Sequence, residues 1–214
     1  MTRASFVALG VLLAACSKST PDASPVPSAT PAAVAPSASA SASPSTSVPA
    51  PPPSASAVPI ANLQANPPTL DGAKALVSEF VKPGIDAAAL TKQLRPTALD
   101  YKTMFDAKTA AQLDAVYSPE WLRGTFVIVA RQGQTEVKIS SATVSDFKAN
   151  NEKAKDFPGG WTKLASHLVG STTFYRFRFV EPGQDQGNAY DGLAYVNSHW
   201  VLVPKPWRGL DDRH

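Results

Sequence analysis

The spacing of apolar residues predicts helices in the first half of the part of the chain that contains aromatic residues. From Ala73 to Val81, apolar side chains recur every three or four residues, which is the period of an amphipathic helix. Thr69 precedes this pattern and Pro83 follows it, so the helix should lie between them. Because proline cannot donate a helical hydrogen bond, a later helix should end before Pro119. Capping Asp or Thr residues and helical periods predict three further helices, over residues 87–94, 98–105 and 106–117.

The second half of the chain changes to the period of two that is typical of strands. Residues 172–180 read Thr-Thr-Phe-Tyr-Arg-Phe-Arg-Phe-Val and are the clearest strand of the sequence. Short turns between most of the expected strands favour antiparallel pairing. A short helix that contains Leu164 and Leu168 should come before residues 172–180. The other strands are expected from runs of β-branched and aromatic residues, over residues 125–130, 136–139, 189–196 and 199–203.

Helices followed by a meander of about four to five strands define an α+β domain, with short N-terminal helices packed on a curved antiparallel sheet. This element order, together with Trp161 and the segments 175–179, 190–193 and 200–203, resembles the nuclear-transport-factor-2-like (cystatin-like) fold. The resemblance implies a conical pocket, in which enzymes of that fold often use Asp or His. The helix expected within the run of strands departs from the pattern, and an independent cystatin-like or lipocalin-like arrangement is the alternative.

Composition divides the 214 residues into unlike parts. Residues 17–59 contain no aromatic residue and carry eleven of the chain's 20 prolines. Such a segment cannot bury enough apolar surface to offset the entropy of ordering, so we expect residues 16–60 to be a disordered Pro/Ala/Ser-rich tether. Residues 61–214 hold all four Trp and all five Tyr, and we expect them to form a single globular domain.

Residues 1–15 have the form of an export signal. Arg3 is followed by a largely apolar run from Ala4 to Ala15. This run is shorter than the roughly 20 residues that span a bilayer. It ends in Leu13-Ala14-Ala15-Cys16, which resembles the lipobox of bacterial lipoproteins. The resemblance implies that the Cys16 thiol accepts a diacylglyceryl group and that the leader is cleaved before this residue.

Cys16 is the only cysteine of the chain, so lipid attachment would use the single thiol that an exported protein would otherwise leave free. The implied acyl chains would anchor the protein firmly, at about 0.8 kcal/mol for each buried methylene. In Gram-negative envelopes, an Asp directly after the cysteine resembles the signal for retention in the inner membrane. Because position 17 is Ser, the sequence favours the outer membrane.

Titratable residues are few and scattered in the predicted domain, which favours a non-enzymatic module that binds a small apolar ligand or an envelope protein. Arg176 and Arg178 share one face of their strand. They either lie in solvent with an acidic partner across the sheet or form an anion site. Trp207 either folds back onto the core or forms an aromatic and cationic patch with Lys205. The candidate contact residues are Tyr175, Arg176, Arg178, Tyr190, Lys205 and Trp207.

The alternative is a small enzyme whose conical pocket uses Asp191 or His199 for acid–base chemistry. A two-residue turn at 197–198 would set His199 across from Val196, so no direct contact between Asp191 and His199 is expected. No cofactor and no metal site are predicted, because the three histidines lack the spacing of zinc ligands. The net charge of +3 includes no run of five basic residues, so nucleic acid is not an expected partner. The oligomeric state stays open.

Overall fold

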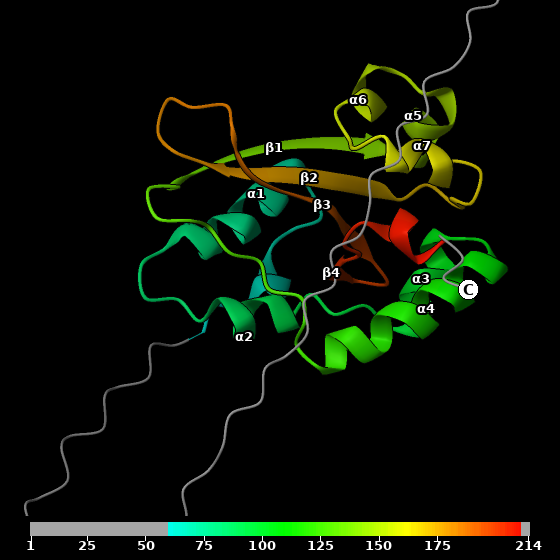
Figure 1. The fold of residues 1–214 in the computed structure, drawn as a ribbon, viewed down its shortest axis with the longest axis horizontal. Coiled ribbons are helices and arrows are strands. Elements are labelled where there is room, and N and C mark those ends of the chain that lie inside the picture. Colours follow the sequence, from blue (N-terminus) through cyan, green and yellow to red (C-terminus); the bar gives the residue numbers. More distant parts are fainter. Residues whose placement is uncertain (1–59, 211–214) are drawn as a thin grey trace, which may run out of the picture. The chain divides into compact units, whose positions relative to one another are not determined.

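The computed structural model describes residues 60–210, and its helices and four-stranded antiparallel sheet confirm the predicted α+β class (Figure 1). The predicted signal sequence, the lipobox with Cys16 and nearly all of the predicted tether lie outside the described residues. The N-terminal helices are η1 (Leu63–Ala65), α1 (Leu70–Ser78), η2 (Glu79–Val81), α2 (Ala87–Lys92), α3 (Ala98–Met104) and α4 (Ala107–Leu122). The remaining elements are β1 (Glu136–Thr143), α5 (Val144–Ala149), α6 (Glu152–Lys155), α7 (Gly160–Leu164), β2 (Thr173–Val180), β3 (Gly187–Val196), β4 (His199–Leu202) and η3 (Pro206–Gly209).

The predicted capping residues begin the four N-terminal α-helices. The side chains of Thr69, Asp86, Thr97 and Asp106 each accept a backbone N–H from the first turn. The cap of α3 is reciprocal, because Asp100 Oδ2 also accepts the backbone N–H of Thr97 at 2.7 Å. Helices this short are marginal in isolation, so caps and tertiary packing must hold them together.

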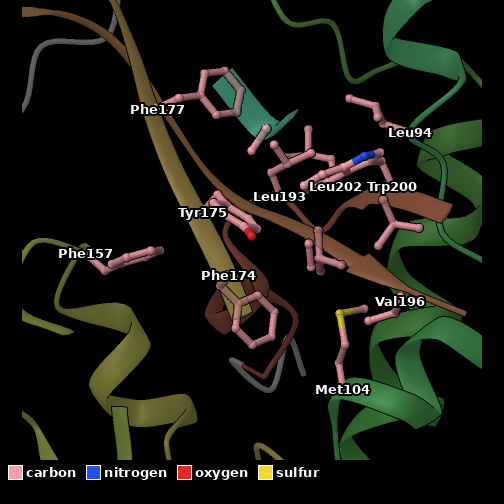
Figure 2. Packing of buried hydrophobic residues seen from close by; sticks show 14 of the residues in the cluster. Leu94, Met104, Phe157, Phe174, Tyr175, Phe177, Leu193, Val196, Trp200 and Leu202 are labelled. Carbon is pink, nitrogen blue, oxygen red and sulfur yellow. The ribbon is translucent and has the colours of Figure 1, made fainter. Parts of the chain in front are cut away.

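The sheet has the strand order β1-β2-β3-β4, and aromatic side chains pack on both of its faces. On one face, Phe179 of β2 lies 6.5 Å from the ring of Phe80, which follows α1. On the other face, Phe174 lies 4.8 Å from Trp161 of α7. Figure 2 shows Phe174, Tyr175 and Phe177 along β2 among other buried side chains of the core. η2 thus packs on one face of β2 and α7 packs on the other, and the buried residues on both faces belong to one hydrophobic cluster.

A β-bulge interrupts the pairing of β2 with β3. Tyr175 pairs with Leu193, but the next residue, Arg176, pairs with Asp191. Gly192 is therefore an extra residue on β3. A bulge of this kind bends the strand and increases its local twist, which accounts for the turn of β3 away from β2 in Figure 1.

The bulge requires glycine for two reasons. Gly192 has a φ of +86°, in the left-handed region that residues with a Cβ rarely adopt. A Cβ at this position would lie 2.0 Å from the carbonyl oxygen of Val203. The Val203 N–H donates to the Gly192 carbonyl oxygen at 2.9 Å, so the chain just after β4 is held against the bulge. The paired part of β4 ends there, with Leu202 opposite Leu193.

The prediction of a strand over residues 125–130 is wrong, because this segment joins no sheet. Its backbone is held by side chains. The Ile128 N–H donates to Thr91 Oγ1 at 2.9 Å, and the Val129 N–H donates to the Tyr190 hydroxyl at 2.9 Å. The Asn188 side-chain amide donates to the Val129 carbonyl at 3.1 Å. The segment thus covers the part of β3 that β4 does not reach, and its β-branched residues fit that half-buried position without ladder bonds.

The prediction that α4 ends before Pro119 is also wrong, because the helix continues to Leu122. Proline near the end of the helix forfeits one backbone hydrogen bond. The last turn gains the burial of Trp121, which is 6% exposed and lies 5.1 Å from the ring of Phe126. Between β1 and β2 the sequence predicted one short helix, and the structure has three. The first of these, α5, begins with a capping box at Thr143 that the sequence analysis did not use.

Replacing Gly192 by alanine should lower the free energy of unfolding by about 3 kcal/mol or more, because it adds both a backbone penalty and a clash with Val203. Gly183 is a matched control, since its φ is +75° and no atom lies within 4 Å of a Cβ built there. Gly183→Ala should cost only about 1 kcal/mol. Urea unfolding of both variants checks this expectation. Equal losses in the two variants would show that the contact with Val203 has no energetic weight.

Candidate functional site

A cavity of about 700 Å³ opens beside β3, past the end of β4. Its walls come from α4, from the segment 125–128, from residues 189–191 of β3 and from the chain between Leu202 and Gly209. The side-chain hydrogen bonds of Tyr190 to the Val129 backbone hold the segment 125–130 against β3. A space of this size is within the range of pockets for small organic molecules.

The inner wall is mainly apolar and aromatic. It includes Phe126, Ile128, Tyr190 and Leu202, together with Tyr117 of α4. The rings of Tyr117 and Phe126 lie 5.7 Å apart. The Tyr117 hydroxyl donates to the Lys205 carbonyl oxygen at 2.8 Å, which ties α4 to the C-terminal segment. The wall therefore favours an apolar or aromatic group.

Apolar and charged side chains share the rim of the cavity, where Lys205 and Arg208 are accompanied by Glu120, which pairs with Arg123. Val116 and Val127 line it and are 43% and 38% exposed, so the rim presents apolar surface to solvent. Lys205 and Arg208 line it from the C-terminal segment, and both are exposed. A ligand with an apolar body and an anionic end would match both kinds of surface.

Asp191 supplies a buried carboxylate to the cavity wall. It is 6% exposed, and its Oδ1 accepts a hydrogen bond from Trp161 Nε1 at 3.1 Å. Burial is the largest influence and raises the pKa of Asp191 above its usual value near 3.8. The Trp161 hydrogen bond and the charges of Arg176 and Lys205 act in the opposite direction and only partly offset it. The group can therefore hold a proton at a higher pH than an exposed aspartate can.

The two candidate arginines lie outside this cavity on the Phe174 face of β2. Arg176 stands opposite Asp191 in the sheet, and its Nη1 donates to the Asp156 carbonyl oxygen. Arg178 Nη1 donates to the Asp185 carbonyl oxygen at 3.1 Å. Both guanidinium groups are half-buried and each binds a backbone carbonyl. One sequence interpretation placed both arginines in solvent with an acidic partner across the sheet. Arg176 has such a partner in Asp191, whereas Arg178 lies opposite Lys138 and Ala189, and neither arginine is fully exposed.

Of the other candidate contacts, Tyr190 and Lys205 line the cavity, whereas Trp207 and Tyr175 do not. Trp207 packs on α7, with its ring 6.2 Å from that of Trp161. A Cβ at Gly160 would lie 2.2 Å from the Trp207 ring, so this glycine makes the close contact possible. Trp207 thus folds back onto the core, and Lys205 faces the cavity without it.

His199 serves a different part of the fold. It pairs with Val196, as the turn length predicted, and its Nε2 lies 3.1 Å from Asp100 Oδ2. Asp100 also accepts a hydrogen bond from the Asn197 side chain at 2.7 Å. Burial raises the pKa of Asp100, but the hydrogen bonds from Thr97 and Asn197 outweigh it, and the net pKa is lowered. His199 thus helps to fix the β3–β4 turn to α3 and does not line the cavity.

The sequence analysis missed the contribution of α4 and of the segment 125–128 to the site. Phe126 and Val127 were assigned to a strand, and Val116 was treated as part of a helix face. Only the folded path of the chain shows that these side chains lie beside one another at the cavity. Within residues 60–210, no three His, Cys, Asp or Glu side chains form a group that could hold a metal ion. In the same residues, no helix has the length and apolar character needed to cross a membrane.

Comparisons with protein-family models, with curated proteins and with solved structures found no significant match for this chain. The resemblance to the nuclear-transport-factor-2-like fold therefore stays a prediction. A function for this chain has to be inferred from its own sequence, from its fold and from the geometry of the cavity.

Proposed function

We propose that this protein is a lipid-anchored lipoprotein of the cell envelope whose domain binds a small amphipathic ligand in the cavity beside β3. One observation carries the second half of this proposal. The cavity combines an aromatic wall, which includes Tyr117 and Phe126, with a rim that holds Lys205 and Arg208. An apolar body would rest against the rings, and an anionic end would meet the two cations.

The anchoring half of the proposal rests on the leader sequence. Residues 13–16 read Leu-Ala-Ala-Cys after a short apolar run, and Cys16 is the only cysteine. Lipid on this residue would place the domain on a membrane through the intervening Pro/Ala/Ser-rich segment. Ser17 favours the outer membrane over the inner one. A domain held at the envelope in this way would meet amphipathic molecules that pass along or between the membranes.

The anchor is tested by replacing Cys16 with serine. The variant should keep its leader or leave the membrane fraction, because serine cannot accept the thioether-linked lipid. Ser17→Ala serves as the matched control and should fractionate as the natural protein does. Membrane fractionation and mass spectrometry of the purified protein measure both effects. A Cys16→Ser protein that is cleaved and stays in the membrane would refute the anchor.

The cavity is tested with 1-anilinonaphthalene-8-sulfonate, an anionic aromatic probe, added to residues 17–214 produced without lipid. Binding should raise its fluorescence and saturate at one site. Ala189 is exposed on β3 and lines the cavity, so Ala189→Trp should place an indole ring in the space that the probe would occupy and strongly weaken binding. Ala115→Trp, on an exposed alanine of α4 outside the lining, is the control. Unchanged binding by the Ala189→Trp variant would place the probe elsewhere.

The charge of Lys205 and Arg208 makes a second prediction about the same probe. Replacing both by glutamine should weaken binding of the sulfonate by about tenfold, since each exposed ion pair contributes up to about 1 kcal/mol. The neutral probe N-phenyl-1-naphthylamine should bind equally to the natural protein and to this variant. An equal loss of affinity for both probes would mean that the two cations maintain the form of the cavity and do not select an anionic ligand.

Acid–base catalysis by Asp191 is the second candidate function, and the raised pKa of this buried carboxylate in a cavity wall favours it. A protonated Asp191 could donate to a bound substrate, and its ionised form could accept a proton. His199 is not part of this candidate, because it contacts Asp100 and does not line the cavity.

The raised pKa predicts a specific dependence of stability on pH. Between pH 3.8 and the raised value, the folded protein holds the Asp191 proton while the unfolded chain has lost it. The free energy of unfolding, relative to that of Asp191→Asn, should therefore fall as the pH rises through this window. Asp185, whose pKa is lowered by Lys138, is the control. Stability relative to Asp185→Asn should fall as the pH decreases, and the same direction for both residues would contradict the assignment.

A further inference from the structure

A second hollow, of about 410 Å³, lies at the other end of β3. It is lined by residues 170–173 at the start of β2, by Tyr175, and by Tyr195 and Val196 at the end of β3. Thr103 of α3 and Pro68 complete it. We call this hollow the hydroxyl groove. It shares no lining residue with the cavity beside β3, so what it binds is a separate question.

The groove is rich in hydroxyl groups and lacks charge. None of the residues that line it is Asp, Glu, Lys, Arg or His. The Thr103 hydroxyl donates to the Leu99 carbonyl oxygen at 3.0 Å. Within residues 60–210, five other hydroxyls of the lining make no hydrogen bond to the protein, and these belong to Ser171, Thr172, Thr173, Tyr175 and Tyr195.

Tyr175 is the unusual member of this group. It is 5% exposed, and its ring lies 5.5 Å from that of Trp200. Burial raises the pKa of Tyr175. The buried side-chain polar atoms without a partner in the described residues belong to other residues, so the Tyr175 hydroxyl reaches solvent. Tyr175 also lines the groove, so a solvent-accessible hydroxyl belongs to an otherwise buried side chain of its wall.

We infer that the hydroxyl groove binds a neutral glycan. A hydroxyl can both donate and accept a hydrogen bond, which matches the hydroxyls of a sugar and offers nothing specific to an ion. The ring of Tyr195, which is half-buried, adds apolar surface for the C–H face of a sugar ring. An anionic or cationic ligand would lose its hydration without gaining an opposite charge, which disfavours it. The volume accommodates a short stretch of an oligosaccharide rather than an extended polymer segment.

Saturation-transfer NMR with the full lipidated chain, in a phosphocholine detergent that carries no sugar, tests this inference. The probes are the trisaccharides of N-acetylglucosamine, of β-linked glucose and of α-linked glucose, each beside its monosaccharide. At least one trisaccharide should show saturable transfer. The monosaccharide arm tells whether the groove recognises a single sugar or a chain. Absence of saturable transfer from all three trisaccharides overturns the inference.

The double variant Tyr175→Phe and Thr172→Val removes two groove hydroxyls and keeps the side-chain shapes. It should weaken trisaccharide binding by at least about fivefold, because each hydrogen bond contributes modestly to the net affinity. Its melting temperature should not change, since neither hydroxyl bonds to the protein. Thr162→Val, on an exposed residue of α7 outside the groove, is the matched control. Unchanged affinity in the double variant, or an equal loss in the control, overturns the assignment to this groove.

The same preparations separate this inference from the proposed function. Ala189→Trp places an indole ring in the other cavity and should leave trisaccharide binding unchanged. The double variant, made in residues 17–214, should bind the naphthalene sulfonate as the natural protein does. Loss of glycan binding in Ala189→Trp would overturn the placement of the sugar in the hydroxyl groove.

Discussion

The close approach of the Val203 carbonyl oxygen to Gly192 is the constraint on which the rest of the domain depends. Only a residue without a Cβ fits there, and only a positive φ gives the bulge its shape. The bulge changes the register between β2 and β3, so that Asp191 stands opposite Arg176 and points toward Trp161. A regular strand would move the residues on one side of Gly192 to the opposite face. The position of the buried carboxylate therefore depends on one glycine.

Two hollows that differ in chemistry lie along β3, one on either side of the bulge. Before it, Tyr190 and Asp191 line a cavity with an aromatic wall and a rim that holds Lys205 and Arg208. After it, Tyr195 and Val196 line a groove of uncharged hydroxyl groups. One strand thus lines two hollows of different composition. The two proposals together predict a domain that binds an amphipathic molecule and a glycan independently.

Much of the fold could be predicted because it depends on capping residues and turns that are recognisable over a few neighbouring positions in the sequence. Capping residues such as Thr97 and Asp106 began the helices as expected, and the turn at 197–198 fixed the pairing of His199 with Val196. The segment 125–130 could not be predicted, because its β-branched run fits either a ladder or a covering segment. What decides between them is the Tyr190 hydroxyl, about 60 residues away in the chain, which binds the Val129 backbone.

The candidate site was predictable only in part, for a similar reason. Tyr190, Lys205 and Asp191 stood out as polar or aromatic residues on strands and at a strand end, and all three line the cavity. Composition could not show that Val116 of α4 would meet them at one rim. It also could not show that Trp207 would pack on Gly160 and leave Lys205 to face the cavity without it. Both depend on contacts between distant parts of the chain.

The most direct test of the central claim is native mass spectrometry of the full-length protein, gently extracted from the cells that make it. The account predicts a bound small molecule of one defined mass, with an apolar body and an anionic end, which is lost from the Ala189→Trp variant. It also predicts that the Ala115→Trp variant retains this molecule. A protein that carries no such molecule, or that retains the same mass after the indole ring has been placed in the cavity, would contradict the claim that the cavity beside β3 is a ligand-binding site.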